Sequence, residues 1–590
     1  MDPFAAAKGN CLKKLIDAGL EARKSYDAIS KEIDQFIDSQ DYAFMYNATD
    51  PDLSFYARVS LMGQAVDMFL PQIVSANPHR IATVRNQNDQ LTVARASIVE
   101  EYLNRLPNET GLYEENVMAG EQGLAHGRGV MWTGFNPRTK LVQTVFDSDC
   151  NLVLDPDAKS LNRLHWVARK REKPRWELLE LYPDQGSSIA SLKGKTPGRE
   201  ASSKAELLCY YEIYMRVGLH RYSEASYGAE ETGDQPKKYV ISEDGKLLFE
   251  GPWELPWFVD NAWPCEVWDP RGRPSHIWPR SVLEPGLGHQ KALNYLYTDY
   301  VSKFRASAKI MMAYIRNSGV SISEEGKSDL FNINSRFPIL ELEGQGLDDP
   351  DINKIFQQLK IDPGTSDFVE AYGIIKREFE EHTGLYSIFH AGHQPSQSRS
   401  AKDAEMKDRN SRTRLDVLQM RFERFQSKIA RKEAIAARFL HTPEEITNIL
   451  GPEQGQLWGQ IMPPQEASMD PMAVNFEQFF KETDYSIETG SIRSRNIDQK
   501  IDALQEIMQT TVPVQMASMD LNEKALAYET MAEYHKTLGN LDNLVAQERE
   551  MAANLKNQAL MMAQMQQAMA MQPAADPAGA APVPASPVVA

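Results

Sequence analysis

The stretch that decides the fold is SAKDAEMKDRNSRTRLDVLQMRFERFQSKIARKEAIAARFL, residues 400–440, which contains 41 residues and neither glycine nor proline. Such a run predicts one helix of roughly 60 Å, because each helical residue adds about 1.5 Å. Ser400 and Asp403 resemble a capping box at its start. The first half is almost entirely polar, whereas the second half has apolar residues at three- and four-residue spacing. We expect the second half to pack on other elements and the first half to project into solvent or a cavity. The apolar positions are Leu415, Leu418, Phe422, Phe425, Ile429, Ala436 and Phe439.

Directly upstream, residues 384–399 read GLYSIFHAGHQPSQSR and predict a polar loop, because glycine and proline interrupt any helix there. Before this loop, a helix is expected over residues 366–383, with Gly384 as its C-cap. Its apolar stripe consists of Phe368, Tyr372, Ile375 and Phe379. The pattern is therefore a helix, a polar loop and a very long helix.

Another helix is expected over residues 287–308, with Leu293, Leu296, Tyr297, Tyr300 and Phe304 on one side. Two strand-like runs, 309–316 and 337–343, lie between it and the helix at 366–383. A chain that leaves on one helix, builds a small strand module and returns on another helix can form a stalk.

The rest of the sequence predicts an α+β fold that is mainly helical. Helices are expected near residues 12–37, from 62 to a stop at Pro71, at 89–106, at 111–125, at 175–182, at 496–509 and at 523–571. Strands are expected at 81–84, 130–133, 141–146, 164–170, 207–217, 238–241 and 485–487. The Trp- and Pro-rich run 253–278 predicts a packed, extended connector without regular structure. Residues 573–590 predict a disordered Pro/Ala tail.

Composition limits the possible functions. The chain has 590 residues and a formal net charge of −18, which argues against a tight, enveloping nucleic-acid binder. Its four cysteines form no CxxC pattern, so a reducing compartment is expected. No signal-peptide pattern and no apolar run of about 18 residues occur, so no membrane partner is expected. Residues 399–440 hold twelve Lys and Arg against six Asp and Glu. They form either a solvated helix face with ion pairs or a basic surface matched to an acidic neighbour or a phosphate backbone.

The sequence offers no catalytic constellation. An acidic cluster raises the possibility of a metal site, but residues 147–158 lack the glycine and the glutamate that an EF-hand needs. Turn formation is the stronger interpretation of these carboxylates. His390 and His393 lie in the polar loop without nearby carboxylate or cysteine ligands. No phosphate-loop, GxSxG or HExxH motif is present. We therefore expect no metal, no cofactor and no enzymatic activity. The cluster consists of Asp147, Asp149, Asn151, Asp155 and Asp157.

Several short pieces appear in the order found in one known family, so that the chain resembles the portal, or head-to-tail connector, proteins of tailed bacteriophages over most of its length. The pieces are Asn77-Pro78 before the strand at 81–84, Asp155-Pro156-Asp157-Ala158 before 164–170, the helix with Gln290 and Asn294, the helix at 368–379, the loop into Arg399-Ser400-Ala401, and Glu488-Thr489-Gly490-Ser491 before the C-terminal helices. Each piece alone is short, and their order carries the resemblance.

The resemblance implies a protomer of a cyclic ring, expected to hold twelve copies, around a central channel. The implied parts are a wing (1–282 and 400–489, the latter including the long helix), two stem helices (283–308 and 363–383), a clip (309–362), a tunnel loop (384–399), a helical crown (490–572) and the tail (573–590). The implied contacts to DNA in the loop region are His390, His393, Gln394, Ser396, Gln397, Arg399 and Lys402. Lys303, Arg305, Lys376 and Arg377 are the implied channel-facing residues of the stem.

As a portal protein, the chain would assemble in the host cytoplasm and reside at one vertex of the virion capsid. Double-stranded DNA would pass through it during packaging and ejection, with only weak contact. The implied protein partners are the terminase large subunit, a tail or adaptor protein, the scaffold and the major capsid protein. Two alternatives remain open from the sequence. One is another virion component, such as an adaptor or an internal head protein, and the other is a metal-dependent nuclease that uses Asp147, Asp149 and Asp155.

Overall fold

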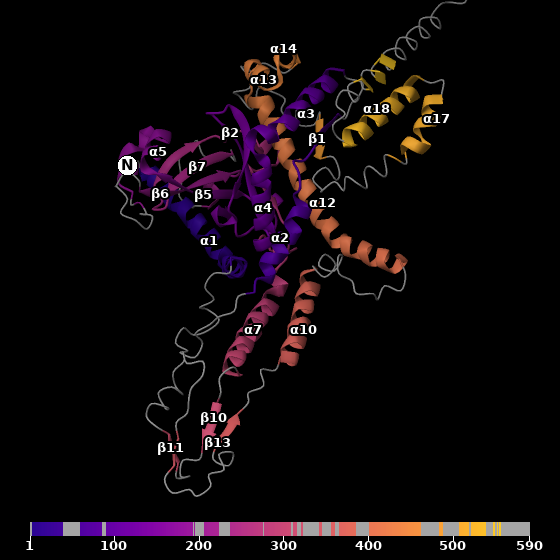
Figure 1. Ribbon diagram of the computed structural model, residues 1–590. Coiled ribbons are helices and arrows are strands. Elements are labelled where there is room, and N and C mark those ends of the chain that lie inside the picture. The colour runs from indigo at the N-terminus through magenta and orange to yellow at the C-terminus, as the bar shows by residue number, and fades with distance from the viewer. Residues whose placement is uncertain are drawn as a thin grey trace, which may run out of the picture. The chain divides into compact units, whose positions relative to one another are not determined.

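The long helix and the elements around it form an α+β protein in which helices predominate among the described residues (Figure 1). The computed structural model describes residues 3–38, 59–84, 90–192, 206–222, 236–307, 365–384, 401–461 and 483–487 with single-residue gaps, short strands between 311 and 359, and parts of 505–555. Contacts divide the chain into two units, Met1–Arg493 and Ser494–Ala590.

The helices of the first unit are α1 Pro3–Ile37, α2 Leu61–Ile73, α3 Gln90–Thr110, α4 Leu112–His126, α5 Arg175–Leu181, α6 Gly186–Ala190, α7 Leu287–Ser307, α10 Thr365–Thr383, α12 Ala401–Leu440, α13 Pro443–Leu450 and α14 Pro452–Ile461. Its strands are β1 Arg80–Val84, β2 Gly129–Asn136, β3 Leu141–Asp147, β4 Leu152–Leu154, β5 Trp166–Pro174, β6 Leu207–Met215, β7 Lys237–Ser242, β8 Leu247–Gly251, β9 Cys265–Trp268, β10 Met311–Tyr314, β11 Val320–Ile322, β12 Leu342–Gly344, β13 Phe356–Leu359 and β14 Thr483–Ile487. The second unit contains α17 Val512–Ala517 and α18 Leu521–Leu538.

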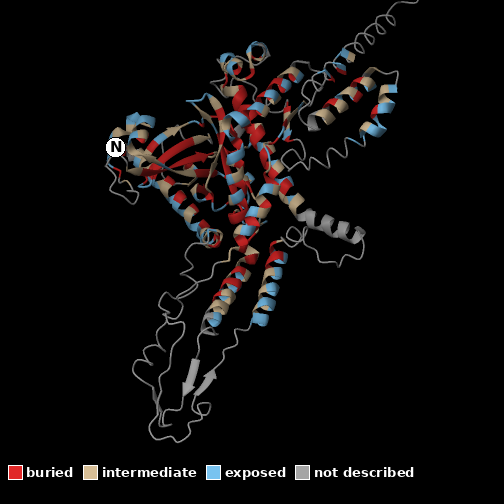
Figure 2. Ribbon diagram, in the orientation of Figure 1, coloured by how far each residue is buried: buried red, intermediate tan, exposed pale blue. Residues whose placement is uncertain are grey.

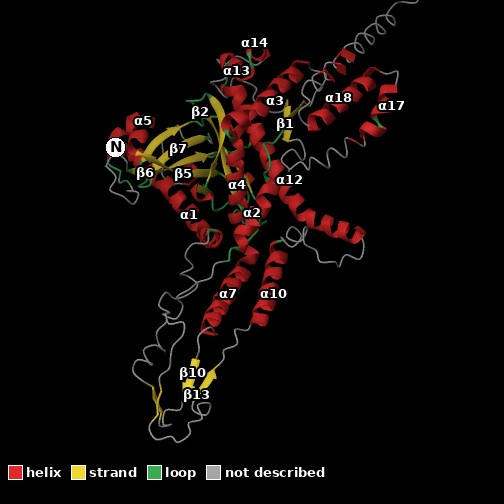
Figure 3. Cartoon of the chain, in the orientation of Figure 1, coloured by secondary structure: helices red, strands yellow, loops and turns green. Residues whose placement is uncertain are grey.

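The largest sheet has the strand order β4-β5-β6-β7-β8, with every neighbouring pair antiparallel (Figure 3). Helix α1 covers one face, where its Leu12 and Ile16 pack with Trp166 on β5. Helices α5 and α6 cover the other face, where Leu178 packs with Tyr210 on β6. Because both faces are covered, β6 is an almost continuous apolar run rather than an alternating one.

The long helix α12 packs against a second antiparallel sheet of order β3-β2-β9 and against α2 and α3. Phe422, Phe425 and Ile429 of its second half are almost fully buried, and Phe422 meets the ring of Trp268 edge-on with centroids 5.1 Å apart. The prediction that the second half of this helix packs on other elements is confirmed, and its buried residues are red in Figure 2. Of its first half, residues 401–414 are helical, and their side chains lie outside the described set.

Strands β1 and β14 form a separate antiparallel pair, from Arg80 opposite Ile487 to Val84 opposite Thr483. This pairing joins two segments that are about 400 residues apart in the sequence. Strand β14 packs against α12, and β1 is joined to α12 by the ion pair of Arg80 described below. The strand predicted at 485–487 is therefore confirmed, with two more residues at its start.

Other predictions need correction. Pro71 does not end α2, which continues to Ile73, and Pro107 lies inside α3, which was expected to stop at residue 106. Both prolines occupy the last turn of their helix, where each removes one backbone hydrogen bond, and the nearby Ile73 and Leu106 are buried. The Trp-rich connector is packed as expected, with Trp268 and Trp278 buried, but it also contains a regular strand, β9.

Two further boundaries differ from the prediction. In the run expected at 337–343 the described strand is only β12, residues Leu342–Gly344. The C-terminal helix expected at 523–571 begins earlier, as α18 at Leu521, and its described continuous part ends at Leu538. Within the second unit α17 and α18 contact one another. The predicted tail at 573–590 lies outside the described residues.

Candidate functional site

Helices α7 and α10 form an antiparallel hairpin, which we call the stem hairpin (Figures 1 and 3). Its seam is aromatic: Tyr300 stacks on Phe368 with ring centroids 4.0 Å apart, and Tyr297 and Tyr372 flank the same phenylalanine. At the other end His289 lies against His382 at 4.8 Å. The two apolar stripes predicted from sequence thus face each other. Phe304 is the exception, because its side chain remains about half exposed.

Beyond the hairpin's far end, the chain makes two small antiparallel ladders, β10 with β13 and β11 with β12. Met311 pairs with Leu359 and Tyr314 with Phe356, so the first ladder closes the connection between the two stem helices. The predicted strand module between the helices is therefore present. The other residues of 308–364 lie outside the described set.

The opposite end of the stem hairpin, its root, is fixed to the core by buried polar groups on α7. Gln290 is fully buried; it accepts a hydrogen bond from the Leu61 amide at 2.9 Å and donates to the carbonyl oxygen of Val59. Asn294, one turn later, accepts from the Val59 amide at 3.2 Å. These side chains satisfy backbone groups at the start of α2, where leaving them unpaired in a buried site would be costly.

Close packing also holds the second stem helix at the root. Gly286 precedes α7, and a Cβ atom added there would lie 2.5 Å from the ring of Phe379 and 2.9 Å from Thr383 on α10. Gly384 ends α10 with a left-handed φ of 84°, and its amide donates to the carbonyl oxygen of Glu380 at 2.9 Å. The C-cap predicted at Gly384 is confirmed, and the chain leaves α10 toward the segment that precedes α12.

Few of the predicted site residues fall within the described set. Residues 385–400, with His390, His393, Gln394, Ser396, Gln397 and Arg399, lie outside it, as do the side chains of Arg305 and Lys402. Lys303 is exposed and pairs with Asp299 of its own helix at 2.8 Å, a hydrogen bond that raises the pKa of the lysine. Lys376 approaches Glu380 one turn away at 3.9 Å, and Arg377 is exposed. The structure thus places Lys303, Lys376 and Arg377 on the stem hairpin.

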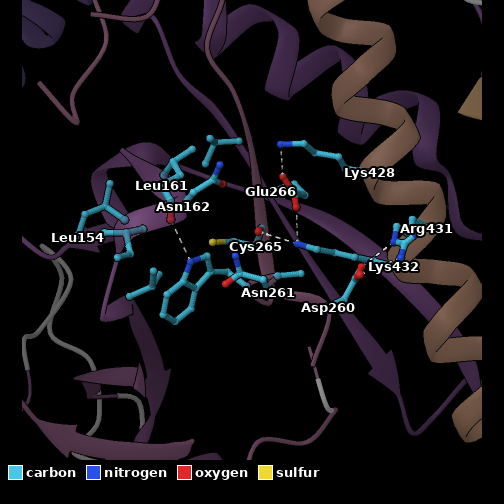
Figure 4. Close-up of a pocket in the computed structure, with 15 residues that line it drawn as sticks. Leu154, Leu161, Asn162, Asp260, Asn261, Cys265, Glu266, Lys428, Arg431 and Lys432 are labelled. Atoms are coloured by element: carbon cyan, nitrogen blue, oxygen red, sulfur yellow. Dashed lines mark hydrogen bonds and ion pairs between the residues drawn. The ribbon is translucent and has the colours of Figure 1, made fainter. Parts of the chain in front are cut away.

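The described part of α12 is fixed by charged side chains beside a cavity of about 220 Å³ (Figure 4). Lys432 donates to the carbonyl oxygen of Cys265 at 2.7 Å and forms an ion pair with Glu266 at 3.0 Å. Arg431 donates a hydrogen bond to each carboxylate oxygen of Asp260. Burial raises the pKa of the Cys265 thiol to about 11, so the thiol is protonated near neutral pH. These cations are neutralised by α12's neighbours, so the cavity is a packing feature rather than an anion site.

The three aspartates of the nuclease alternative do not act together. Asp147 pairs with Arg169, Asp149 accepts hydrogen bonds from Tyr26 and His126, and Asp155 accepts one from the amide of Asp157. The last bond is the turn chemistry expected from the sequence. Among the described residues, no three or more His, Cys, Asp or Glu side chains are placed to hold a metal ion.

Sequence reasoning missed a buried charge network next to these aspartates. His126 lies between Asp149 and Asp34, with its Nδ1 3.1 Å and its Nε2 2.6 Å from their carboxylates. Burial lowers the pKa of His126, but the two carboxylates outweigh it and raise that pKa to about 10. The imidazolium is therefore a permanent structural cation at neutral pH. A histidine at the end of a helix gives no sequence signal for partners 92 and 23 residues away.

Comparison with known proteins adds no assignment, because no protein-family model and no curated protein matches this chain. Within the described ranges, no helix is both long and apolar enough to cross a bilayer.

Proposed function

We propose that the chain is the protomer of a portal ring, the channel through which double-stranded DNA enters and leaves the head of a tailed bacteriophage. The observation that carries the proposal is the stem hairpin. It bears a small strand module at one end, is fixed to the core by Gln290 at the other, and leads through residues 385–400 into the 40-residue helix α12. This is the order of stem, clip, stem, tunnel loop and long helix that the sequence resemblance implies.

The charge of the chain supports a conduit rather than a clamp. Each phosphate that a protein neutralises strengthens binding, so many tight phosphate contacts would hold a duplex that has to move. A net charge of −18 keeps such contacts few. In the proposed ring the polar residues of segment 385–400, with Arg399 as the charged group of each copy, touch phosphates and release them. The terminase large subunit would dock during packaging and a tail or adaptor protein afterwards, and the scaffold and the major capsid protein would surround the ring during assembly.

Electron microscopy of the purified full-length chain tests the proposal. Negative-stain images are expected to show rings with a central hole, and averages along the ring axis would give the copy number, expected to be twelve. A ring of identical copies around a channel needs a heterologous contact, in which two different surfaces of the protomer meet. A chain that stays monomeric at micromolar concentration over a range of salt conditions would contradict the proposal.

A further inference from the structure

A cavity of about 460 Å³ lies between α1, the connection from β4 to β5 and the loop that leads from β9 to α7. Small ligands occupy cavities of roughly 300–1,000 Å³. Helix α1 contributes Tyr26 and Ser30 to the lining, the connection contributes Lys159, and the loop contributes Arg273 and Trp278. The lining residues lie outside the stem hairpin and outside segment 385–400, so the portal proposal gives this cavity no role.

The aromatic wall of the cavity is fixed by its neighbours. The ring of Trp278 stacks on the ring of Tyr26, with centroids 4.9 Å apart and planes 29° apart. The guanidinium groups of Arg23 and Arg128 lie over the same indole, at 4.9 and 5.2 Å from its centroid. Because these contacts already hold the wall in place, a ligand gains affinity without having to order it.

Two polar groups of the lining have no hydrogen-bond partner among the described residues. They are the indole N–H of Trp278 and the hydroxyl group of Ser30, and the two residues are only 7% and 5% exposed. A buried polar group without a partner costs free energy, so such groups commonly bind water or a ligand. The indole nitrogen can only donate, and its partner therefore has to be an acceptor.

Cations exceed carboxylates where the cavity opens. Arg273 and Arg280 share a single carboxylate oxygen, Oε1 of Glu284, at 3.4 and 3.3 Å. Lys159 is exposed and has no ion pair within the described ranges, and Asp157 is the other carboxylate of the lining. Guanidinium and ammonium groups, like the indole nitrogen, donate hydrogen bonds and accept none. The groups around this cavity are therefore mainly donors, which suits a ligand rich in acceptor oxygens.

We propose that the cavity binds a small oxyanion, a molecule that carries carboxylate or phosphate groups. One of its oxygens accepts hydrogen bonds from Trp278 and Ser30, and others pair with Arg273 and Lys159, the residue types that proteins use for such groups. The bound molecule joins α1 to the loop that continues into the stem hairpin at Leu287. This inference does not depend on the portal proposal.

Binding to the full-length protein tests the inference. Citrate supplies carboxylates and pyrophosphate supplies phosphates, and each is titrated against sodium chloride of the same ionic strength. One of them is expected to raise the Tm in a saturable way, because a ligand that binds only the folded chain stabilises it. Isothermal titration calorimetry is expected to give one site per chain for that probe. The better probe identifies the class of oxyanion, and the absence of saturable binding by both would overturn the inference.

Variants locate the bound probe. Arg273→Gln with Lys159→Gln is expected to weaken binding about tenfold or more, because two charged donors are lost. The matched control is Arg138→Gln with Lys14→Gln, which removes two exposed cations outside the cavity and is expected to bind like the wild type. An equal loss in both double variants would show general charge attraction and overturn the inference.

A third variant tests the inner wall and guards against misfolding of the double variants. Ser30→Ala removes only a hydroxyl group, and alanine favours the helix, so the fold is expected to match the wild type by circular dichroism. Its affinity for the probe is expected to fall about threefold. Unchanged affinity in Ser30→Ala would place the probe outside the cavity. A short DNA duplex that displaced the probe would assign the site to DNA phosphates, and either result would overturn the inference.

Discussion

Arg80 on β1 and Glu433 on α12 form an ion pair in which neither side chain is more than 2% exposed. The arginine also donates to the carbonyl oxygen of Leu103, and Thr144 on β3 donates to Glu433 at 2.6 Å. The pair thus joins the long helix to a strand 353 residues earlier, and Thr144 links it to the sheet β3-β2-β9. Two charges removed from water are tolerated in this way only when each satisfies the other.

We predict that Glu433→Ala is strongly destabilising, because it leaves the Arg80 guanidinium buried without its counter-charge. The expected loss in the free energy of unfolding is about 3–5 kcal/mol. Urea unfolding followed by circular dichroism measures it. The double variant Arg80→Met with Glu433→Leu removes both charges and is expected to recover most of the loss.

The control for this prediction is Lys428→Ala on the same helix. The Lys428 side chain is 61% exposed and stands 3.6 Å from Glu266, so its removal is expected to change stability by less than about 0.5 kcal/mol. If Glu433→Ala unfolded at the same urea concentration as the wild type, the pair would not hold α12 to the core.

This pair also marks the limit of what the sequence predicts. The spacing of Phe422, Phe425 and Ile429 indicates which face of the long helix is buried, and the same periodicity predicts the seam of the stem hairpin. The charges of the helix were expected on a solvated face or a basic surface, whereas Lys432 and Glu433 are buried and paired. Their partners come from β9 and β1, and no local pattern connects residues so far apart.

The root of the stem hairpin likewise has features that the sequence predicts and contacts that it does not. Sequence order identifies the helix with Gln290 and Asn294, and its apolar residues predict the packing on α10. The bonds from Gln290 to Val59 and Leu61 depend on how α7 meets α2, which only the folded chain defines. For the residues that we propose contact DNA, Arg399 among them, the proposal rests on the sequence resemblance.

The buried imidazolium of His126 predicts a specific pH dependence of stability. Its pKa rises from an ordinary value near 6.5 in the unfolded chain to about 10 in the folded one. The stabilisation is therefore complete below pH 6.5 and is lost as the pH rises from 6.5 toward 10. It is on the order of 1–4 kcal/mol, since Asp34 is half exposed and screened by solvent. The urea midpoint of the wild type is expected to fall between pH 6.5 and 8.5.

His126→Gln isolates this effect, because it removes the titrating group and is expected to flatten the slope of stability against pH in that range. His165→Gln is the matched control; His165 also contacts an aspartate, Asp155 at 3.0 Å, but its side chain is 56% exposed. An equal flattening in both variants, or an unchanged slope in His126→Gln, would show that the imidazolium between Asp149 and Asp34 does not carry the dependence.

Deletion of residues 388–396 tests the role proposed for the segment before α12. The deletion leaves the stem hairpin and α12 in place, so ring assembly is expected to match the wild type in negative-stain images. Because the proposed DNA contacts of His390, His393, Gln394 and Ser396 are removed, packaged DNA per particle is expected to fall. If the deletion variant packaged and retained DNA as the wild type does, the segment would have no role in the proposed channel.

Two glycines at the start of the first stem helix give opposite predictions. In Gly286→Ala the new Cβ atom would come within 2.5 Å of the Phe379 ring, so either this side chain or α10 has to shift, and a loss of about 1–3 kcal/mol is expected. In Gly288→Ala the Cβ atom enters open space, and the better helix propensity of alanine is expected to add up to about 1 kcal/mol. Thermal unfolding of the two variants beside the wild type measures both changes. If Gly286→Ala were as stable as Gly288→Ala, the root of the stem hairpin would be loosely packed, and α10 would be held by its aromatic seam with α7 alone.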